Sequence, residues 1–369
     1  IRASDWSSDV CSSDLEFKCA LLRSMPAGLR GQQKDTLAEI MKNIRRILTM
    51  KCLIIDAVHE SITEELGKYM QVDNLYTAEM EGKAANAPLT SEQLKNVIGD
   101  YDVLIMRVDP AITEEVLDAA KNLKVIGVCS VGLNHINMDC AKAKGIQVFN
   151  APGLNANAVA ELTLSKMLDM SRHTMPANVD VKVNHQWDKY KFVGRELRGR
   201  TLGILGFGRI GQLVAGLAHA FKMNIVAYDP FLPDEKFGEN NATKMETIED
   251  LLKVADYVTI HMPLLPTTKN LINAKSIATM KPDCIVLNMA RGGIVNEQDM
   301  YEALKAGKIG GYATDVMVDE LSEGADFNSP LFECDNFIVS PHLGAQTVDA
   351  SRDIGAHIIA KVKEALNLG

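Results

Sequence analysis

The feature that most constrains how this chain can fold is the hexapeptide GFGRIG at 206–211, which stands between a strand-like and a helix-like segment. The preceding TLGIL is a short apolar run, and the following QLVAGLAHAF has helical spacing. In such a unit the first glycine permits the turn, the second lets the backbone approach a pyrophosphate, and the third lets the helix pack on the strand. The N–H groups that begin the helix face the anion. The sequence therefore predicts a dinucleotide-binding loop formed by Gly206, Gly208 and Gly211.

An acidic residue, Asp229, closes the next predicted strand, NIVAYD. A carboxylate at this place accepts hydrogen bonds from the ribose hydroxyls and repels a 2′-phosphate. We therefore expect NAD rather than NADP as the cofactor. The alternative interpretation is a structural glycine turn followed by a surface aspartate.

Strand-like and helix-like segments alternate along the chain from Met50 onward. The first series of strands is CLIID, DVLIM, KVIGV and IQVFN, and the second, from Thr201, is TLGILG, NIVAYD, YVTIHM, CIVLNM, IGGYATDV and NFIVS. Longer helical patterns lie between and after the two series, at 155–175 and 346–366. Because such alternation is typical of parallel sheets covered by helices, we predict an α/β protein with two doubly wound parallel-sheet domains.

Charge and cysteine content exclude several classes of function. The chain has 369 residues and a net charge of -9, so we expect no nucleic-acid partner. No apolar run reaches the roughly 18 residues of a membrane helix, so we expect no membrane contact. The seven cysteines form no CxxC pair and no metal-ligand spacing, which favours reduced thiols, no bound metal and a cytoplasmic location.

The first 49 residues differ in character from the rest. The string DWSSDVCSSDL has neither helical nor strand periodicity and resembles the in-frame translation of a sequencing-library adapter. We therefore expect residues 1–49 to be a non-native extension and Met50 to be the true start. Residues 50–148, completed by 345–369, are expected to form a substrate-binding domain, and residues 149–344 an NAD-binding domain.

Two charged side chains follow strands of the second series. Arg291 comes after CIVLNMA and His342 after NFIVSP, at the carboxyl ends where open α/β sheets bind ligands. A hydride-transferring site needs a group that exchanges the alcohol proton and a cation that holds an acid substrate. His342 and Arg291 are candidates for these two functions, although each taken singly is also typical of a capping or solvated residue.

The motifs together resemble those of the D-isomer-specific 2-hydroxyacid dehydrogenase family. The similarity runs from Met50 to Gly369 and rests on VGLNHIN, VFNAPG, LRGRTLGILGFGRIG, HMPLLPTTKNLI, NMARGGIVNEQDM, ATDV and SPHLG. The resemblance implies a flavodoxin-like substrate domain and a Rossmann NAD domain, with the active site in the cleft between them. It also implies an NAD-dependent oxidoreductase that interconverts a D-2-hydroxy acid and its 2-keto acid, and a homodimer.

The resemblance further implies a catalytic set of Arg291, Glu320 and His342. His342 would exchange the proton of the substrate hydroxyl, and Arg291, in ARGG, would hold the carboxylate and the C2 oxygen. Glu320 would orient the imidazole and raise its pKa. Asp319 is the alternative to Glu320, because Leu321 stands where the family usually has proline.

A set of cofactor contacts also follows from the resemblance. Asp315, in ATDV, matches the position that contacts the nicotinamide carboxamide, and His261 and Pro263 match the segment that flanks the adenine. His261 and Pro263 are equally compatible with plain loop residues. The full predicted set is Gly206, Phe207, Gly208, Arg209, Ile210, Gly211, Asp229, His261, Pro263, Ala290, Asp315, His342 and Gly344.

Within the family the chain resembles the short-type D-3-phosphoglycerate dehydrogenases, which oxidise 3-phosphoglycerate to 3-phosphohydroxypyruvate in serine biosynthesis. Arg107, in LIMRVDPAIT, matches the position that holds the substrate phosphate. Valines stand where relatives often have a second cation, at Val128, and a serine, at Val108. Backbone N–H groups near Val131 and Gly132 are expected to bind the carboxylate. Arg107 is also compatible with a salt bridge at the domain edge.

Two other functions stay open. The first is a hydroxypyruvate or glyoxylate reductase, for which the motif SVGLNH is also typical. The second is an NAD-responsive corepressor that binds partner peptides, which would keep the same catalytic residues. Because the sequence ends soon after the last predicted helix, we expect no C-terminal regulatory domain of the long phosphoglycerate dehydrogenases and no serine feedback through one.

Overall fold

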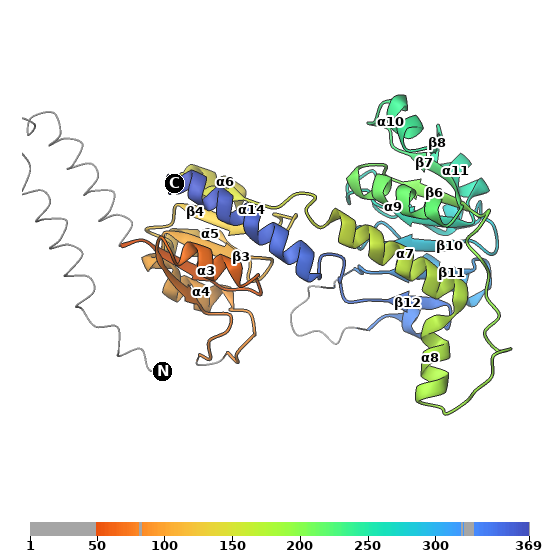
Figure 1. The fold of residues 1–369 in the computed structure, drawn as a ribbon, viewed down its shortest axis with the longest axis horizontal. Coiled ribbons are helices and arrows are strands. Elements are labelled where there is room, and N and C mark those ends of the chain that lie inside the picture. The colour runs from red at the N-terminus through yellow and green to blue at the C-terminus, as the bar shows by residue number, and fades with distance from the viewer. Residues whose placement is uncertain (1–48, 81–82, 319, 321–327, 369) are drawn as a thin grey trace, which may run out of the picture. The chain divides into compact units, whose positions relative to one another are not determined.

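The chain divides into two compact units, each built around one sheet. The computed structural model describes residues 49–80, 83–318, 320 and 328–368. The predicted non-native extension, 1–49, therefore lies outside the described residues except for Thr49. Among the described residues, the smaller unit contains those up to Gly127 together with 135–148 and 362–368, and the larger unit contains 128–134 and those from 149 to 361. Figure 1 shows the elements of each unit. The assignment of one domain to substrate and one to NAD, with the boundaries given above, stays a prediction.

The smaller unit contains a five-stranded sheet in the order β2-β1-β3-β4-β5. Its strands are β1 (Lys51–Ile54), β2 (Gln71–Asn74), β3 (Val103–Met106), β4 (Val125–Val128) and β5 (Gln147–Phe149). β1 pairs in parallel with both β2 and β3. β3 and β4 are buried along their whole length, as expected for continuous apolar runs in a parallel sheet. The order 2-1-3-4-5 is that of flavodoxin-like folds, which confirms this part of the predicted fold class.

Short helices connect these strands. They are α3 (Ser61–Leu66), α4 (Ser91–Val97), the 3-10 helix η2 (Ile98–Asp100), α5 (Glu114–Ala119) and α6 (Met138–Ala143). α4 begins at a capping box, in which the Thr90 hydroxyl accepts the Gln93 N–H at 3.2 Å and the Gln93 side chain accepts the Thr90 N–H at 3.0 Å. Both bonds satisfy N–H groups that the start of a helix leaves unpaired.

The larger unit contains a seven-stranded sheet in the order β12-β11-β10-β9-β6-β7-β8. Its strands are β6 (Thr201–Leu205), β7 (Asn224–Tyr228), β8 (Thr243–Lys244), β9 (Tyr257–Ile260), β10 (Ile285–Asn288), β11 (Gly311–Thr314) and β12 (Phe337–Val339). Every neighbouring pair is parallel. The chain winds one way from β6 to β8 and the other way from β9 to β12, which confirms the predicted Rossmann topology. Ligands bind at such a switch point, beyond the carboxyl ends of the strands, and here it lies between β6 and β9.

Helices connect and follow these strands. They are α7 (Ala156–Arg172), α8 (Thr174–Lys182), α9 (Arg209–Ala220), α10 (Asp234–Glu239), α11 (Ile248–Val254), α12 (Ala274–Ile277), α13 (Glu297–Lys305), the 3-10 helix η3 (Pro330–Glu333) and α14 (Val348–Leu366), whose end belongs to the smaller unit. α7 packs against α9, β10 and β11 (Figure 1). None of the described helices is both long and apolar enough to span a membrane.

The helical pattern at 155–175 forms two helices instead of the single one predicted. α7 ends at Arg172, His173 takes the left-handed conformation at φ +53°, and α8 starts at Thr174. Pro176 explains the break, because its ring would clash with the carbonyl of Arg172 in a continuous helix, whereas the first turn of a new helix tolerates it.

Candidate functional site

The predicted site residues of the larger unit lie where its parallel strands end. Because all these strands run in one direction, their carboxyl ends meet at one edge of the sheet. The residues at this edge follow β6, β7, β9, β10, β11 and β12 in turn, and are Gly206, Asp229, His261, Arg291, Asp315 and His342.

The glycine loop makes a tight turn and leaves open space at the start of α9. Gly206 has φ +90°, and a Cβ there would lie 2.9 Å from the backbone of His261, so only glycine fits. A Cβ at Gly211 would collide with the Gly206 carbonyl oxygen. Gly208, the N-cap of α9, has no atom within 4 Å of its Cβ position. The loop therefore leaves open space in front of the first N–H groups of α9, where an anion is stabilised.

The three residues between the glycines, Phe207, Arg209 and Ile210, have side chains in different surroundings. Phe207 is fully buried and stacks on Phe237 at 5.1 Å, so only its backbone faces the loop. The guanidinium of Arg209 lies against Gly153, because a Cβ at Gly153 would overlap it. Ile210 is half-buried and packs against the core.

Asp229 is fixed by two backbone donors. Its Oδ2 accepts the N–H of Phe207 at 2.9 Å, and its Oδ1 accepts the N–H of Phe231 at 3.0 Å. The first bond ties the end of β7 to the glycine loop. Each carboxylate oxygen can accept more than one bond, so the group still suits a ribose hydroxyl.

His261 is a neutral histidine under the glycine loop. Its Nε2 pairs with the Thr259 hydroxyl at 2.9 Å, and its buried Nδ1 has no hydrogen-bond partner among the described residues. Burial lowers the pKa of His261 to about 3. Pro263 is exposed, and its carbonyl accepts the Thr268 hydroxyl at 2.6 Å.

Arg291 lies in a turn that Asn288 holds. The Asn288 amide donates to the Arg291 carbonyl at 2.9 Å and its oxygen accepts the Ala290 N–H at 3.1 Å. The Arg291 Nη1 donates to the Ala290 carbonyl at 2.7 Å. Its Nη2 lies 3.9 Å from the Cβ position of Gly132, so the exposed guanidinium reaches the loop after β4.

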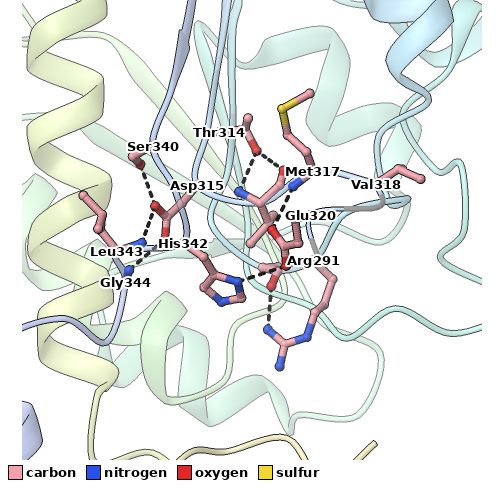
Figure 2. A network of polar contacts seen from close by, with 12 residues as sticks. Arg291, Thr314, Asp315, Met317, Val318, Glu320, Ser340, His342, Leu343 and Gly344 are labelled. Atoms are coloured by element: carbon pink, nitrogen blue, oxygen red, sulfur yellow. Dashed lines mark hydrogen bonds and ion pairs between the residues drawn. The ribbon is translucent and has the colours of Figure 1, made fainter. Parts of the chain in front are cut away.

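Glu320 and His342 form a direct pair. The His342 Nδ1 lies 2.9 Å from the Glu320 Oε1, and the Glu320 Oε2 accepts the Met317 N–H at 3.1 Å. Figure 2 shows the imidazole pointing at Glu320, with Arg291 on the same side. The hydrogen bond to Glu320 raises the pKa of His342, Asp315 also raises it, and burial and Arg291 oppose the shift. Asp319, the alternative partner, lies outside the described residues.

Asp315 is buried and anchors the loop that carries His342. Its Oδ1 accepts the Ser340 hydroxyl at 2.5 Å and the Leu343 N–H at 2.8 Å, and its Oδ2 accepts the Gly344 N–H at 2.7 Å. The Asp315 carbonyl also accepts the His342 N–H at 3.0 Å. The predicted contact of Asp315 with nicotinamide stays a prediction, and its surroundings show a second role.

The predicted substrate residues are divided between the units. Arg107 directly follows β3 in the smaller unit, and Asp56 Oδ2 accepts its N–H and that of Val108, each at 3.0 Å. Val131 and Gly132 belong to the larger unit, where their carbonyls accept the Asn150 amide at 2.7 Å and the Ser130 hydroxyl at 3.3 Å.

Two residues that the sequence did not point to contribute to this edge of the sheet. Asn288 shapes the arginine turn, and Ser340 bonds to Asp315. The only sequence signal for Asn288 and Ser340 is a polar residue at the end of an apolar strand. Among the described residues, no group of histidine, cysteine or acidic side chains is placed to hold a metal ion.

Comparisons with known proteins point to one family. Residues 164–344 match the family model described as D-isomer specific 2-hydroxyacid dehydrogenase, NAD binding domain. The chain is 40% identical over 320 residues to a D-3-phosphoglycerate dehydrogenase of Methanocaldococcus jannaschii, a match that covers 86% of this chain and 57% of the relative. This chain thus spans little more than half of that relative's length.

Two further matches cover most of the similar protein. A hydroxypyruvate reductase of Thermotoga maritima is 38% identical over 281 residues, which are 76% of this chain and 90% of the relative. A D-lactate dehydrogenase from Aquifex aeolicus, solved with NAD and lactic acid, is 27% identical with a TM-score of 0.69 and covers 85% of this chain and 94% of its own.

Proposed function

Because the chain belongs to the D-isomer-specific 2-hydroxyacid dehydrogenase family, we propose that it is an NAD-dependent oxidoreductase that interconverts a D-2-hydroxy acid and its 2-keto acid. The pair of His342 and Glu320, 2.9 Å apart beside Arg291, is the observation that carries the proposal. It lies in the same unit as the glycine loop.

His342 is the proposed proton-transfer group. With Nδ1–H donating to Glu320, the lone pair of Nε2 is available to accept the hydroxyl proton of the substrate during oxidation. The carboxylate of Glu320 then stabilises the imidazolium, which is consistent with the raised pKa of His342. In reduction the same imidazolium returns the proton to the C2 oxygen.

Arg291 and the glycine loop supply the remaining binding groups. The planar guanidinium of Arg291 suits the substrate carboxylate and C2 oxygen. The loop at 206–211 and the first N–H groups of α9 hold the pyrophosphate, and Asp229 holds the adenosine ribose. NAD, when bound, supplies the hydride acceptor for oxidation.

Replacing His342 with alanine tests the proposal. Loss of the proton-transfer group should lower turnover by roughly 100- to 10,000-fold. NADH binding, followed by its fluorescence, should stay close to that of the wild type, since the glycine loop is unchanged. Near-normal turnover of the variant would contradict the proposed role.

We propose 3-phosphoglycerate as the substrate. The similarity to D-3-phosphoglycerate dehydrogenases supports this choice, and Arg107 is the proposed phosphate ligand. Hydroxypyruvate is the second candidate, because the match to a hydroxypyruvate reductase covers 90% of that protein. NADH formation with 3-phosphoglycerate, compared with NADH consumption with hydroxypyruvate and glyoxylate, separates them. Arg107→Met should raise the KM for a phosphorylated substrate only; an equal effect on hydroxypyruvate would count against the assignment.

We also propose that the protein is a homodimer. Large apolar side chains are exposed on α8 and the segment after it, namely Met175, Val179, Val181, Val183, Trp187, Tyr190 and Val193. Such an apolar patch is typical of an interaction site, and two-fold pairs are the commonest assembly. Trp187→Glu should reduce the mass measured by light scattering to that of a monomer, whereas Val348→Glu, at an exposed valine of α14, should not. A monomeric wild type would refute the proposal.

A cytoplasmic location and a role in serine biosynthesis complete the proposed function. Five cysteines in the described residues are free thiols: Cys52, Cys129, Cys140, Cys284 and Cys334. Free thiols are typical of reducing compartments. Expression in a strain that lacks phosphoglycerate dehydrogenase should restore growth without serine; failure with a stable, abundant protein would favour the reductase.

A further inference from the structure

The segment that carries Glu320 is short, and its backbone is held from several sides. It follows β11 closely and contains Val316, Met317 and Val318. The Thr314 hydroxyl donates to the Val316 carbonyl at 2.6 Å and accepts the Val316 N–H at 3.2 Å. Met317 is buried in a hydrophobic core of the larger unit. These contacts fix the start of the segment.

The peptide between Met317 and Val318 lies directly against the arginine turn. A Cβ at Gly292 would collide with the Met317 carbonyl oxygen and would lie 2.8 Å from the Val318 nitrogen, so a side chain has no room there. Gly292 is the residue after Arg291. The backbone of the arginine turn and that of the Glu320 segment are therefore in close contact, and the position of one constrains the other.

Two glutamates accept successive N–H groups of this segment. Glu320 folds back, and its Oε2 accepts the Met317 N–H at 3.1 Å (Figure 2). The Val318 N–H donates to the Oε1 of Glu297 at 2.8 Å. Glu297 is the first residue of α13 and lies 21 residues earlier in the chain. Hydrogen bonds to an ionised carboxylate are stronger than those between neutral groups, so Glu297 is suited to hold this backbone.

The bond from Val318 bears on the catalytic pair because Glu320 depends on the same backbone. The Glu320 Oε1 lies 2.9 Å from the His342 Nδ1, while its Oε2 is bonded to the Met317 N–H. A carboxylate that reaches back to its own segment keeps both bonds only while that backbone keeps its orientation. Rotation of the peptide between Met317 and Val318 would move Glu320 relative to both partners.

We propose that Glu297 is a positioning residue of this site: by fixing the peptide before Val318, its carboxylate sets Glu320 against the imidazole. The inference rests on the roles proposed above for His342 and Glu320. The alternative is that Glu297 only stabilises α13, since an acidic residue in the first turn interacts favourably with the helix dipole. Positioning requires the reach of the side chain, whereas the dipole requires only its charge.

Two conservative variants separate reach from charge, and both residues are tolerated in the first turn of a helix. Glu297→Asp keeps the charge, but its shorter side chain leaves the oxygens out of reach of the Val318 N–H. Glu297→Gln loses the charge and keeps an acceptor oxygen at the same distance. Displacement of a catalytic group costs on the order of 10- to 100-fold in kcat, so Glu297→Asp should lose about that much with little change in the KM for NAD. Glu297→Gln should lose far less; the reverse order would assign Glu297 to the helix dipole and overturn the inference.

Asp299→Ala is the matched control on the same helix. Asp299 also lies in the first turn of α13, and its Oδ2 accepts the N–H of Ala274, at the start of α12, at 2.8 Å. The control loses a charge and a backbone hydrogen bond of the same kind, but that bond leads to a segment without candidate catalytic residues. Its kcat should therefore stay close to that of the wild type. A loss equal to that of Glu297→Asp would point to a general disturbance of α13 and contradict the inference.

The titration of His342 provides a readout that a merely structural role would not move. The imidazole resonance, assigned by its absence in His342→Asn, is followed against pH by NMR in the full-length protein without substrate. The hydrogen bond to Glu320 is the largest cause of the raised pKa of His342, and Asp315 and Arg291 also act on that pKa. Glu297→Asp should therefore lower the pKa toward its value in Glu320→Gln, and Glu297→Gln should leave it closer to the wild-type value.

The background of Glu320→Gln shows whether the effect passes through Glu320. In that background, Glu297→Asp should cause no further change in the pKa of His342. A further fall would mean that Glu297 acts on the imidazole by another route. An unchanged pKa in Glu297→Asp alone, or an equal fall in Asp299→Ala, would refute the positioning role.

Turnover separates this inference from the proposed function. If the wild type turns over no 2-hydroxy acid but Glu297→Asp lowers the pKa of His342 as expected, the proposed function fails and the positioning role stands. If the wild type turns over its substrate and Glu297→Asp changes neither kcat nor this pKa, the inference alone is overturned. A loss of kcat with an unchanged pKa of His342 would also overturn it, because the loss would then not pass through Glu320.

Discussion

At the scale of single residues, the hydrogen bond between His342 and Glu320 determines which ring nitrogen of His342 is free and how readily the ring is protonated. It occupies Nδ1 and leaves Nε2 for the substrate, and it is the largest cause of the raised pKa of His342. The imidazolium therefore persists to higher pH than in an ordinary histidine. In the proposed mechanism reduction needs the imidazolium and oxidation the neutral ring, so the pair should favour reduction near neutral pH and oxidation at alkaline pH.

Replacing Glu320 with glutamine should lower the pKa of His342, because the charge that stabilises the imidazolium is removed. In reduction, the decline of kcat/KM with rising pH should then begin at lower pH than in the wild type. In oxidation, the increase with pH should also begin at lower pH. Glu302→Gln, at an exposed glutamate of α13, is the control. Identical profiles for Glu320→Gln and the wild type would exclude Glu320 as the partner.

The raised pKa of His342 should also make the stability of the folded protein depend on pH. The pKa of His342 in the folded protein lies above its ordinary value of 6.5. The pair therefore contributes stability that is fully present below the unfolded-state pKa and is lost as pH rises through the folded-state pKa. The Tm difference between the wild type and Glu320→Gln should accordingly be larger near pH 6 than at alkaline pH. Half of the His342 side chain is exposed, at 47%, so the effect should be small.

Asp229 should set the preference between the two nicotinamide cofactors. Its carboxylate repels a 2′-phosphate, so Asp229→Ser should raise the ratio of kcat/KM for NADP to that for NAD. The bonds from Phe207 and Phe231 are also lost or weakened, so NAD affinity should fall as well. Asp234→Ser, at an exposed position in the first turn of α10, controls for a general loss of negative charge. An unchanged ratio would remove Asp229 from the cofactor site.

At the scale of structural elements, the proposed cofactor binding should depend most on the glycine loop between β6 and α9. Gly206→Ala would combine a positive φ with a contact of 2.9 Å to the His261 backbone. Gly307→Ala is a matched control, because Gly307 also has a positive φ, +62°, and an open Cβ position. In the control, the free energy of unfolding should fall only by the cost of a positive φ in a non-glycine residue, about 1–2 kcal/mol. Gly206→Ala should lower the free energy of unfolding by more than the control does, and it should also weaken NADH binding. Equal losses for the two variants in urea unfolding would show that the backbone shifts to make room for the added Cβ.

The elements that the sequence predicted are those with a strong local signal. The buried strands of both sheets, among them β3, β4 and β10, are continuous apolar runs, and all were predicted. β2 and β8 were missed, because QVDN and TK are short, carry no apolar run and are not fully buried.

The candidate site was predictable where a single residue follows a recognisable strand, as for Arg291 and His342. Its supporting contacts were not, because they join residues far apart in the chain. Nothing in ATDV indicates that Asp315 would bond to Ser340, Leu343 and Gly344, some 25 to 29 residues later. The burial of Lys166 likewise depends on how α7 packs.

At the scale of the whole molecule, alternating strands and helices predicted two parallel α/β sheets, but periodicity alone does not fix the strand order. The resemblance to a family implied a flavodoxin-like and a Rossmann domain, and the structure supplies the orders β2-β1-β3-β4-β5 and β12-β11-β10-β9-β6-β7-β8. The structure also shows that the smaller unit is discontinuous. Its last part is the end of α14, from Val362, whereas the same helix belongs to the larger unit up to Lys361.

The end of α14 should therefore be required for the smaller unit. Val362, Leu366 and Leu368 are buried, and the Lys363 ammonium lies 2.9 Å from the Tyr69 hydroxyl and 4.6 Å from its ring. A chain that ends at Lys361 loses these contacts, and burial of each large apolar side chain contributes about 1.5–3 kcal/mol.

Hydrogen exchange measures the two units of the truncated chain separately. Amides of β1 and β3 should exchange much faster than in the full chain, while those of β6 and β10 should keep their protection. Ala360→Ser, at an exposed position of α14, controls for a change in the helix itself. Equal loss of protection in both sheets would mean that the two units unfold as one cooperative body, and unchanged protection would mean that the helix end contributes nothing. The expected selective loss would instead make α14 the element through which the chain returns to complete its first sheet.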